Sequence, residues 1–187
     1  MSTTGWVILA IVVGALVVAA IAAWQYTETR RRTGLRDRFG PEYERTVNGS
    51  DSRREGEREL REREERYAEM DIKPLSEASR SRYTEDWEHA EKLFVDDPEL
   101  AAREADRVVR NVLDERGYPS DDHETRAAAV SVDHPHVVER YRHGHDMVHS
   151  NGKSGQERTE NLRKAMVDFR AVFVDMVEPE REAVASR

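Results

Sequence analysis

The 187-residue sequence contains no cysteine, and no charged residue precedes Glu28. The lack of cysteine excludes disulfide bridges, thiolate metal sites and cysteine nucleophiles. The sequence also lacks a glycine-rich phosphate-binding loop and the glycine-flanked serine of many hydrolases, so it offers no recognisable catalytic motif. Because all 30 basic and 38 acidic residues lie from Glu28 onward, the composition argues against a single soluble globule.

Residues 6–24 form a long apolar run without charge. As a helix, these 19 residues would rise about 28 Å, close to the roughly 30 Å thickness of a bilayer's hydrocarbon core. Trp6 and Trp24 stand at the two ends and Tyr26 follows, and such amphipathic rings favour the headgroup level. We therefore predict a single transmembrane helix over residues 6–24.

A cluster of arginines follows this run and predicts its direction in the membrane. The cluster consists of Arg30, Arg31, Arg32, Arg36 and Arg38. Because positive charge is retained on the cytoplasmic side, we expect the C-terminal part of a single-pass membrane protein to be cytoplasmic. The same arginines, close to the membrane, would attract anionic lipid headgroups.

A cleaved signal peptide is the alternative to a membrane anchor, and it would make the protein secreted. Ala20, Ile21 and Ala22 have the small-x-small form of a cleavage site. Residues 2–5 carry no positive charge, however, whereas signal peptides begin with a basic segment. The sequence therefore favours the anchor.

Composition divides the rest of the chain into four parts. Residues 25–51 are predicted to be a basic juxtamembrane linker, and residues 52–70 a charged helix that begins at a Ser52–Glu55 capping box. That helix has only a narrow apolar seam and would be a stalk, or a strut laid along the rest. Residues 71–178 are predicted to form a helical bundle, and residues 179–187 a disordered tail.

Apolar residues recur at intervals of three and four through the predicted bundle, as expected for helices with one buried face. The clearest stripes are Tyr83, Trp87, Ala90 and Phe94; Ala101, Ala105, Val108, Val109, Val112 and Leu113; Val138, Tyr141, His145 and Val148; and Leu162, Ala165, Met166, Phe169, Val172, Phe173, Met176 and Val177. No segment alternates apolar and polar residues over the length of a β-strand, so we expect no sheet. The predicted fold class is all-α, with a transmembrane helix, a charged helix and a small bundle.

Several short motifs resemble a family of membrane-anchored helical proteins from high-GC bacteria. The motifs are LRDRFGPEYERTV at 35–47, FVDDP at 94–98, Ala105-Asp106, RGYP at 116–119, SVDHP at 131–135, Tyr141-Arg142 and NLRKAMVDFR at 161–170. The resemblance covers most of residues 35–175. It implies a small helical domain behind an N-terminal apolar segment, and it implies no activity.

Five of the seven histidines lie between residues 134 and 149. His145 and His149 are four residues apart on a predicted helix, which would let two imidazoles reach one metal ion. No third histidine stands at a fixed motif distance, so His123 or Asp146 could complete a site only through the tertiary fold. From the sequence we predict no metal site, no other cofactor and a bundle that folds without metal.

A polar pocket around the histidine-bearing helix, predicted at residues 134–149, is the candidate ligand site. Its candidate residues are Tyr118, Asp133, His134, Tyr141, Arg142 and His145. The competing interpretation is that His134 and His145 are core histidines bonded to neighbours and that Asp133 only caps a helix. No catalytic residue is predicted, because a histidine beside an aspartate is common in a charged chain.

The sequence thus favours a non-enzymatic, membrane-tethered helical interaction module that contacts membrane lipid and either a protein partner or its own copies. The alternative is a small-ligand or metal sensor that uses the helix at 134–149. Nucleic acid is not an expected partner, because the net charge of −8 arises entirely after residue 70, in the part that would form the bundle. An exposed apolar groove would favour the first function and converging polar groups the second.

Overall fold

The computed structural model describes residues 32–150 and 155–178, together with single positions before residue 32. A helical segment at 32–39 is followed by α2 (Pro41–Gly49), α3 (Arg53–Ala68), α4 (Glu77–Leu93), α5 (Pro98–Arg116), α6 (His123–Asp133), α7 (Val138–His149) and α8 (Gly155–Val177). No strand occurs within these ranges, so the predicted all-α class is confirmed for them.

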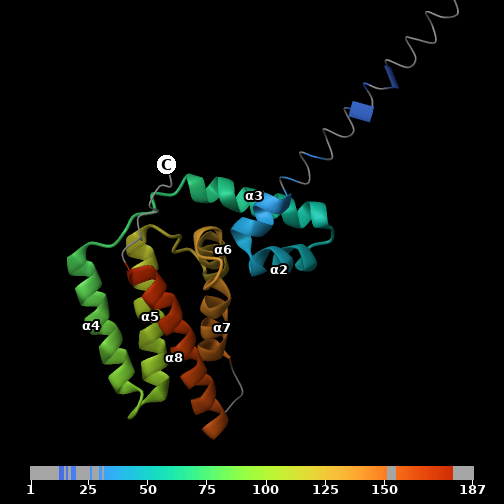
Figure 1. Ribbon diagram of the computed structural model, residues 1–187. Coiled ribbons are helices and arrows are strands. Elements are labelled where there is room, and N and C mark those ends of the chain that lie inside the picture. Colours follow the sequence, from blue (N-terminus) through green and yellow to red (C-terminus); the bar gives the residue numbers. More distant parts are fainter. Residues whose placement is uncertain are drawn as a thin grey trace, which may run out of the picture.

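Helices α4, α5, α7 and α8 run side by side as a bundle, and α2 and α3 cover one end of it next to α6 (Figure 1). Within the bundle α8 packs against both α5 and α7, and α4 packs against α5. The helix α3 contacts α6, so the charged helix predicted at 52–70 is a strut laid on the bundle.

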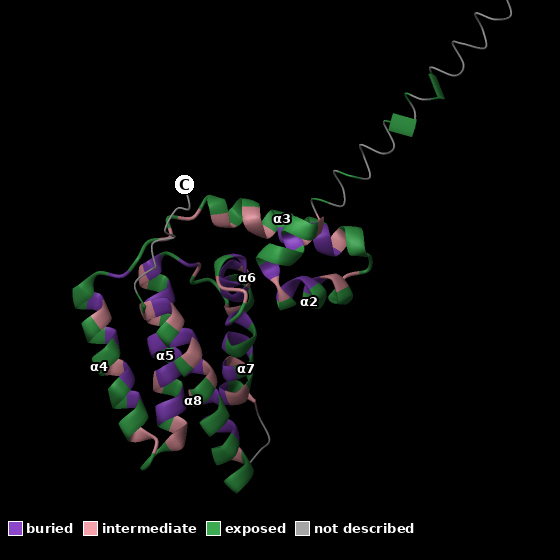
Figure 2. Ribbon diagram, in the orientation of Figure 1, coloured by how far each residue is buried: buried purple, intermediate pink, exposed green. Residues whose placement is uncertain are grey.

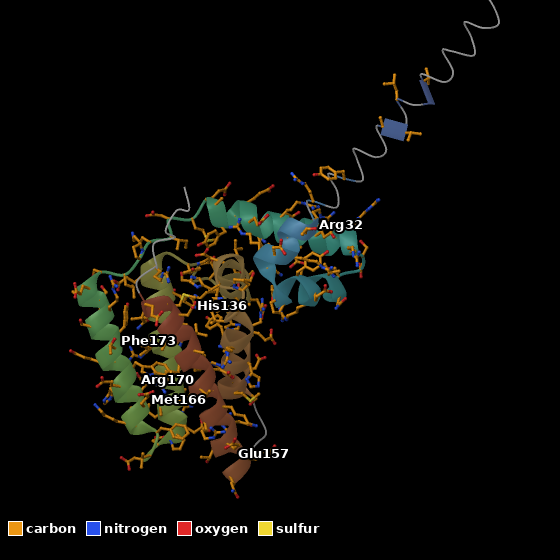
Figure 3. The ribbon with its side chains drawn as sticks, in the orientation of Figure 1. Arg32, His136, Glu157, Met166, Arg170 and Phe173 are labelled. Carbon is orange, nitrogen blue, oxygen red and sulfur yellow. The ribbon has the colours of Figure 1, made fainter. Side chains whose placement is uncertain are left out.

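The core lies between the facing sides of these helices, where buried residues form continuous stripes (Figure 2). Phe173 of α8 stacks on Trp87 of α4, with ring centroids 4.9 Å apart (Figure 3). On α7, Val138, Tyr141 and Val148 are buried as predicted. His145 lies at the edge of this stripe, with its side chain 25% exposed.

Besides the Ser52 box, the sequence predicts helix starts at Ser76 and at Asp97, which Pro98 follows, and polar side chains cap helices at all three positions. The side chains of Ser52, Ser76 and Asp97 each accept a hydrogen bond from the backbone N–H three residues ahead. These bonds satisfy donors that a helix leaves unpaired in its first turn. A glycine followed within two residues by proline, as in Gly117-Tyr118-Pro119, predicts the end of a helix, and Gly117 does end α5 in the left-handed conformation, with φ 101°.

The histidine-bearing helix is shorter than predicted, because α7 begins at Val138 and not at His134. Asp133 is the last residue of α6 and does not cap α7. The reason is Pro135, whose ring disfavours the α-helical conformation of the residue before it. His134 accordingly has φ −122° and ψ 55°, and a turn separates α6 from α7.

The stretch predicted as a juxtamembrane linker, residues 25–51, is largely helical where the structure describes it. Leu35, Phe39 and Tyr43 are buried there, and they pack on Leu60 of α3 and Val132 of α6. Apolar residues are few in this segment, but they fall on one side of two short helices and share a small core with more distant parts of the chain. The segment at 32–39, α2 and α3 therefore form a cap on the bundle.

A buried carboxylate joins this cap to α7. The side chain of Glu42 is 1% exposed, and Arg142 donates two hydrogen bonds to it, at 2.9 and 3.0 Å. Arg63 of α3 donates a third, at 2.8 Å. Burial alone would raise the pKa of Glu42, but the two guanidinium groups outweigh it and lower that pKa. Three helices are thus connected by one ion-pair network.

No helix in the described part of the chain is both long and apolar enough to cross a membrane. Most of the transmembrane helix predicted over residues 6–24 lies outside the described residues, as do Arg31 and the tail predicted at 179–187.

Candidate metal centre

The six residues predicted to share a ligand pocket are divided among separate surroundings. His134 contacts Asp175 of α8 through Nδ1 at 2.5 Å, and His136, on the loop before α7 (Figure 3), contacts the same carboxylate at 2.8 Å. Tyr118 lies beside Tyr67 of α3, with ring centroids 6.4 Å apart. Burial raises the pKa of Tyr67 to about 12, and the neighbouring carboxylate of Asp133 adds to this effect.

The other three predicted residues lie along α7. Arg142 holds the buried Glu42, as described above, and is therefore a structural residue. Tyr141 is fully buried, and its ring packs against His123 with centroids 4.5 Å apart. His145 faces α5 and lies near Asp106. The predicted pocket thus does not form as one site, and only its last member leads to a cluster of metal-binding side chains.

That cluster consists of Asp106 of α5 with His145 and His149 of α7. Each residue offers one ligand atom, and these atoms all lie within 4.8 Å of one another. Nδ1 of His145 is 3.7 Å from Oδ1 of Asp106, too far for a hydrogen bond. Two atoms that bind one tetrahedral zinc ion at about 2.0 to 2.1 Å lie roughly 3.3 to 3.4 Å apart. The observed separation is therefore close to that of two ligands of one ion.

Both facing atoms of this pair lack other partners. Oδ1 of Asp106 and Nδ1 of His145 are buried and have no hydrogen bond. The other carboxylate oxygen of Asp106 pairs with Arg110, 3.1 Å away. A buried polar atom without a partner typically lowers the stability of the fold by about 1 to 3 kcal/mol. The missing hydrogen bonds of these two atoms therefore need an explanation.

Asp106 is the one carboxylate of the cluster, and its pKa is shifted. Burial alone would raise the pKa of the Asp106 carboxyl, but His145, Arg110 and His149 outweigh it and hold that pKa below its usual range. The carboxylate is therefore ionised at neutral pH, as a metal ligand must be.

A backbone contact orients His149. Its Nδ1 lies 2.9 Å from the carbonyl oxygen of His145, which can only accept a hydrogen bond. Nδ1 therefore carries the proton, and Nε2 keeps its lone pair for a ligand. Histidines that bind metals commonly donate their second nitrogen to a carbonyl or carboxylate in this way.

A third imidazole lies next to this pair. His123, the first residue of α6, stacks on His145 with centroids 3.8 Å apart, and His145 stacks on His149 at 4.0 Å. Burial and the nearby His145 both lower the pKa of His123, which favours its neutral form. Asp146, the other residue considered from the sequence, is exposed and lies outside the group of three.

Asp106 was not predicted to belong to a site, although the sequence carries a signal for its burial. Asp106 lies between Ala102 and Val109 at helical spacing, in the middle of the apolar stripe of α5. A carboxylate at such a position is buried, and a buried carboxylate needs a cationic or hydrogen-bonding partner.

The arginines predicted to lie near the membrane are mostly engaged within the cap. Arg36 pairs with Glu44, Arg38 with Glu64 at 3.3 Å, and Arg32 with Glu57 at 3.6 Å. Arg30 lies over the ring of Tyr26, 5.1 Å from its centroid. The positive charges of Arg32, Arg36 and Arg38 in the cap are therefore largely neutralised by neighbouring carboxylates.

A hollow of about 250 Å³ lies between α3 and α6. It is lined by Glu59, Arg63, Arg66, Met70, Glu124, Thr125, Ala128 and Ala129. Five of these eight residues are polar or charged, so the hollow has a mixed lining and is not a purely apolar groove.

No protein-family model matches the chain, and neither a curated protein nor a solved structure matches it.

Proposed function

We propose that the chain is a membrane-tethered helical bundle that binds a divalent transition-metal ion through Asp106, His145 and His149. The observation that carries this proposal is the convergence of one ligand atom from each residue within 4.8 Å. Two imidazoles with one carboxylate suit zinc and related ions, whereas calcium and magnesium prefer sets made only of oxygen.

The unpaired atoms support the same proposal. An ion between Asp106 and His145 would satisfy both buried atoms at once, since it would take a lone pair from each. The three ligands lie on α5 and α7, which already pack against each other. The ion would therefore need little rearrangement of the backbone and could act as a reversible link between the two helices.

Zinc binding with defined ligands is the first expected result. The full chain in mild detergent should bind one zinc ion, measured by competition with a chromophoric chelator. Structural zinc ions bind with about 10 to 16 kcal/mol, or roughly 3 kcal/mol per ligand, so His145→Ala should weaken binding by about 100-fold. Asp106→Asn should weaken it similarly.

His143→Ala is the matched control, because His143 lies on the same helix but is exposed and pairs with Asp168 at 2.5 Å. Its zinc affinity should equal that of the unchanged chain. An unchanged chain that binds no zinc, or His145→Ala and His143→Ala variants with equal affinity, would contradict the proposed site.

Tethering is the second part of the proposal, and it is supported by the uncharged run at 6–24 and the arginines that follow it. With the arginines on the cytoplasmic side of the membrane, the bundle that follows them would lie in the cytoplasm. A protein partner for the bundle stays a prediction.

A single engineered thiol tests this topology. Ser81 is exposed on α4 and the chain has no cysteine, so Ser81→Cys introduces one accessible thiol. In intact cells a membrane-impermeant thiol reagent should leave it unlabelled, and after permeabilisation the same reagent should label it. Labelling in intact cells would show that the bundle lies outside.

A further inference from the structure

We infer that His123 is a fourth protein ligand of this metal centre, so that the ion is enclosed by one carboxylate and three imidazoles. The inference rests on the proposed function and extends it from three ligands on two helices to four ligands on three. It also defines the kind of site, because the number of protein ligands separates structural and regulatory metal sites from catalytic ones.

The position of His123 carries the inference. Its ring lies parallel to that of His145, within 13° and with centroids 3.8 Å apart, and its side chain is only 15% exposed. Nε2 of His123 is buried and has no hydrogen-bond partner. A buried ring nitrogen without a hydrogen-bond partner, on a ring stacked against a residue of the proposed site, is open to a ligand.

The second nitrogen of His123 has a neighbour of its own. Nδ1 lies 3.7 Å from Oε1 of Glu124, on the same turn of α6. A carboxylate at that side favours a proton on Nδ1 and leaves the lone pair on Nε2. The buried, unpartnered atom is therefore the one that could bind an ion.

His123 does not belong to the group of three in the present arrangement, so its ring must turn to reach the ion. Its place in the chain allows this movement. His123 opens α6 directly after Asp122, whose side chain caps the helix. A change in its side-chain angles would meet no preceding helical turn, although it would alter the packing of the ring on Tyr141.

The fourth ligand would change what the site can do. Two histidines and one carboxylate leave coordination positions open to water or another reactant, as in catalytic zinc and non-haem iron sites. A fourth protein ligand fills the tetrahedral position and leaves none. The centre would then join α5, α6 and α7 as a metal-dependent clamp, with no open position for a substrate.

Cobalt substitution tests the ligand count directly, because four-coordinate Co²⁺ absorbs visible light far more strongly than five- or six-coordinate Co²⁺. The full chain in detergent with one equivalent of Co²⁺ should give the intense four-coordinate spectrum. His123→Ala opens the site to two or more waters, so the coordination number rises and that intensity should fall, and its zinc affinity should fall on the order of 100-fold. His123→Gln, which keeps more of the side-chain volume, guards against loss of folding and should behave in the same way.

His89→Ala is the control, since His89 is exposed on α4, and it should leave the spectrum unchanged. A four-coordinate spectrum that persists in a folded His123→Gln variant with unchanged zinc affinity would overturn this inference while the three-ligand site stands. A weak, higher-coordinate spectrum in the unchanged chain would overturn it as well. If the unchanged chain bound neither Co²⁺ nor Zn²⁺, the proposed function itself would fail.

Discussion

Replacing Arg142 with alanine is expected to lower the free energy of unfolding of the full chain by about 3 to 5 kcal/mol. The variant removes both hydrogen bonds from Arg142 to Glu42 and leaves a carboxylate that is 1% exposed with only part of its counter-charge. An uncompensated buried charge costs more than the net contribution of the intact pair. Urea unfolding in mild detergent, followed by circular dichroism, measures the change.

Arg140→Ala provides the comparison on the same helix. Arg140 is half-exposed and lies 3.6 Å from Asp168 at the surface, so its loss should cost no more than about 1 kcal/mol. If the two variants unfolded at the same urea concentration, Glu42 would not depend on Arg142, and the cap would not be held to α7 through this network.

Replacing Gly117 with alanine is expected to destabilise the chain by about 2 to 5 kcal/mol, the sum of two costs. A residue with a side chain pays roughly 1 to 2 kcal/mol in the left-handed conformation, which Gly117 adopts with φ 101°. A β-carbon there would also lie 2.4 Å from the carbonyl oxygen of Asp71, and overpacking of this kind costs about 1 to 3 kcal/mol. The melting temperature of the variant measures the sum.

Gly49→Ala is the matched glycine control. Gly49 ends α2 with a negative φ, and an added β-carbon would meet no atom within 4 Å. This variant should be neutral or gain up to about 1 kcal/mol, because alanine restricts the unfolded chain. A Gly117→Ala chain as stable as Gly49→Ala would show that the Asp71 segment is free to move away from the end of α5.

The sequence predicted those parts of the fold that depend on neighbouring residues. The capping side chains at Ser52, Ser76 and Asp97 and the stop at Gly117 all act within one helical turn, and each is found where the sequence placed it. The start of α7 was missed because the helix was predicted from residue 134, whereas Pro135 lies in the turn before α7.

Contacts between distant segments could not be predicted in the same way. Glu42 and Arg142 are 100 residues apart, and nothing local indicates that they meet. The small core of Leu35, Phe39 and Leu60 likewise depends on how α3 packs across the end of the bundle. For this reason residues 25–51 were predicted to be a linker.

In the candidate site, too, the features within one helix were predictable and the contacts between helices were not. The spacing of His145 and His149 was recognised in the sequence, because it lies within one helix. Asp106 and His123 come from two other helices, and only the packing of α5 and α6 against α7 brings them near. Asp106 carried a signal of its own, as a charged residue within an apolar stripe, but the stripe does not specify its partner.

Anomalous diffraction at the zinc absorption edge, from crystals of the full chain grown with zinc, tests the central claim most directly. The account predicts one strong peak within bonding distance of Asp106, His145 and His149, with occupancy that survives washing in zinc-free buffer. A strong peak only at another histidine pair, such as His134 and His136 on Asp175, or no peak at the Asp106 cluster, would contradict it.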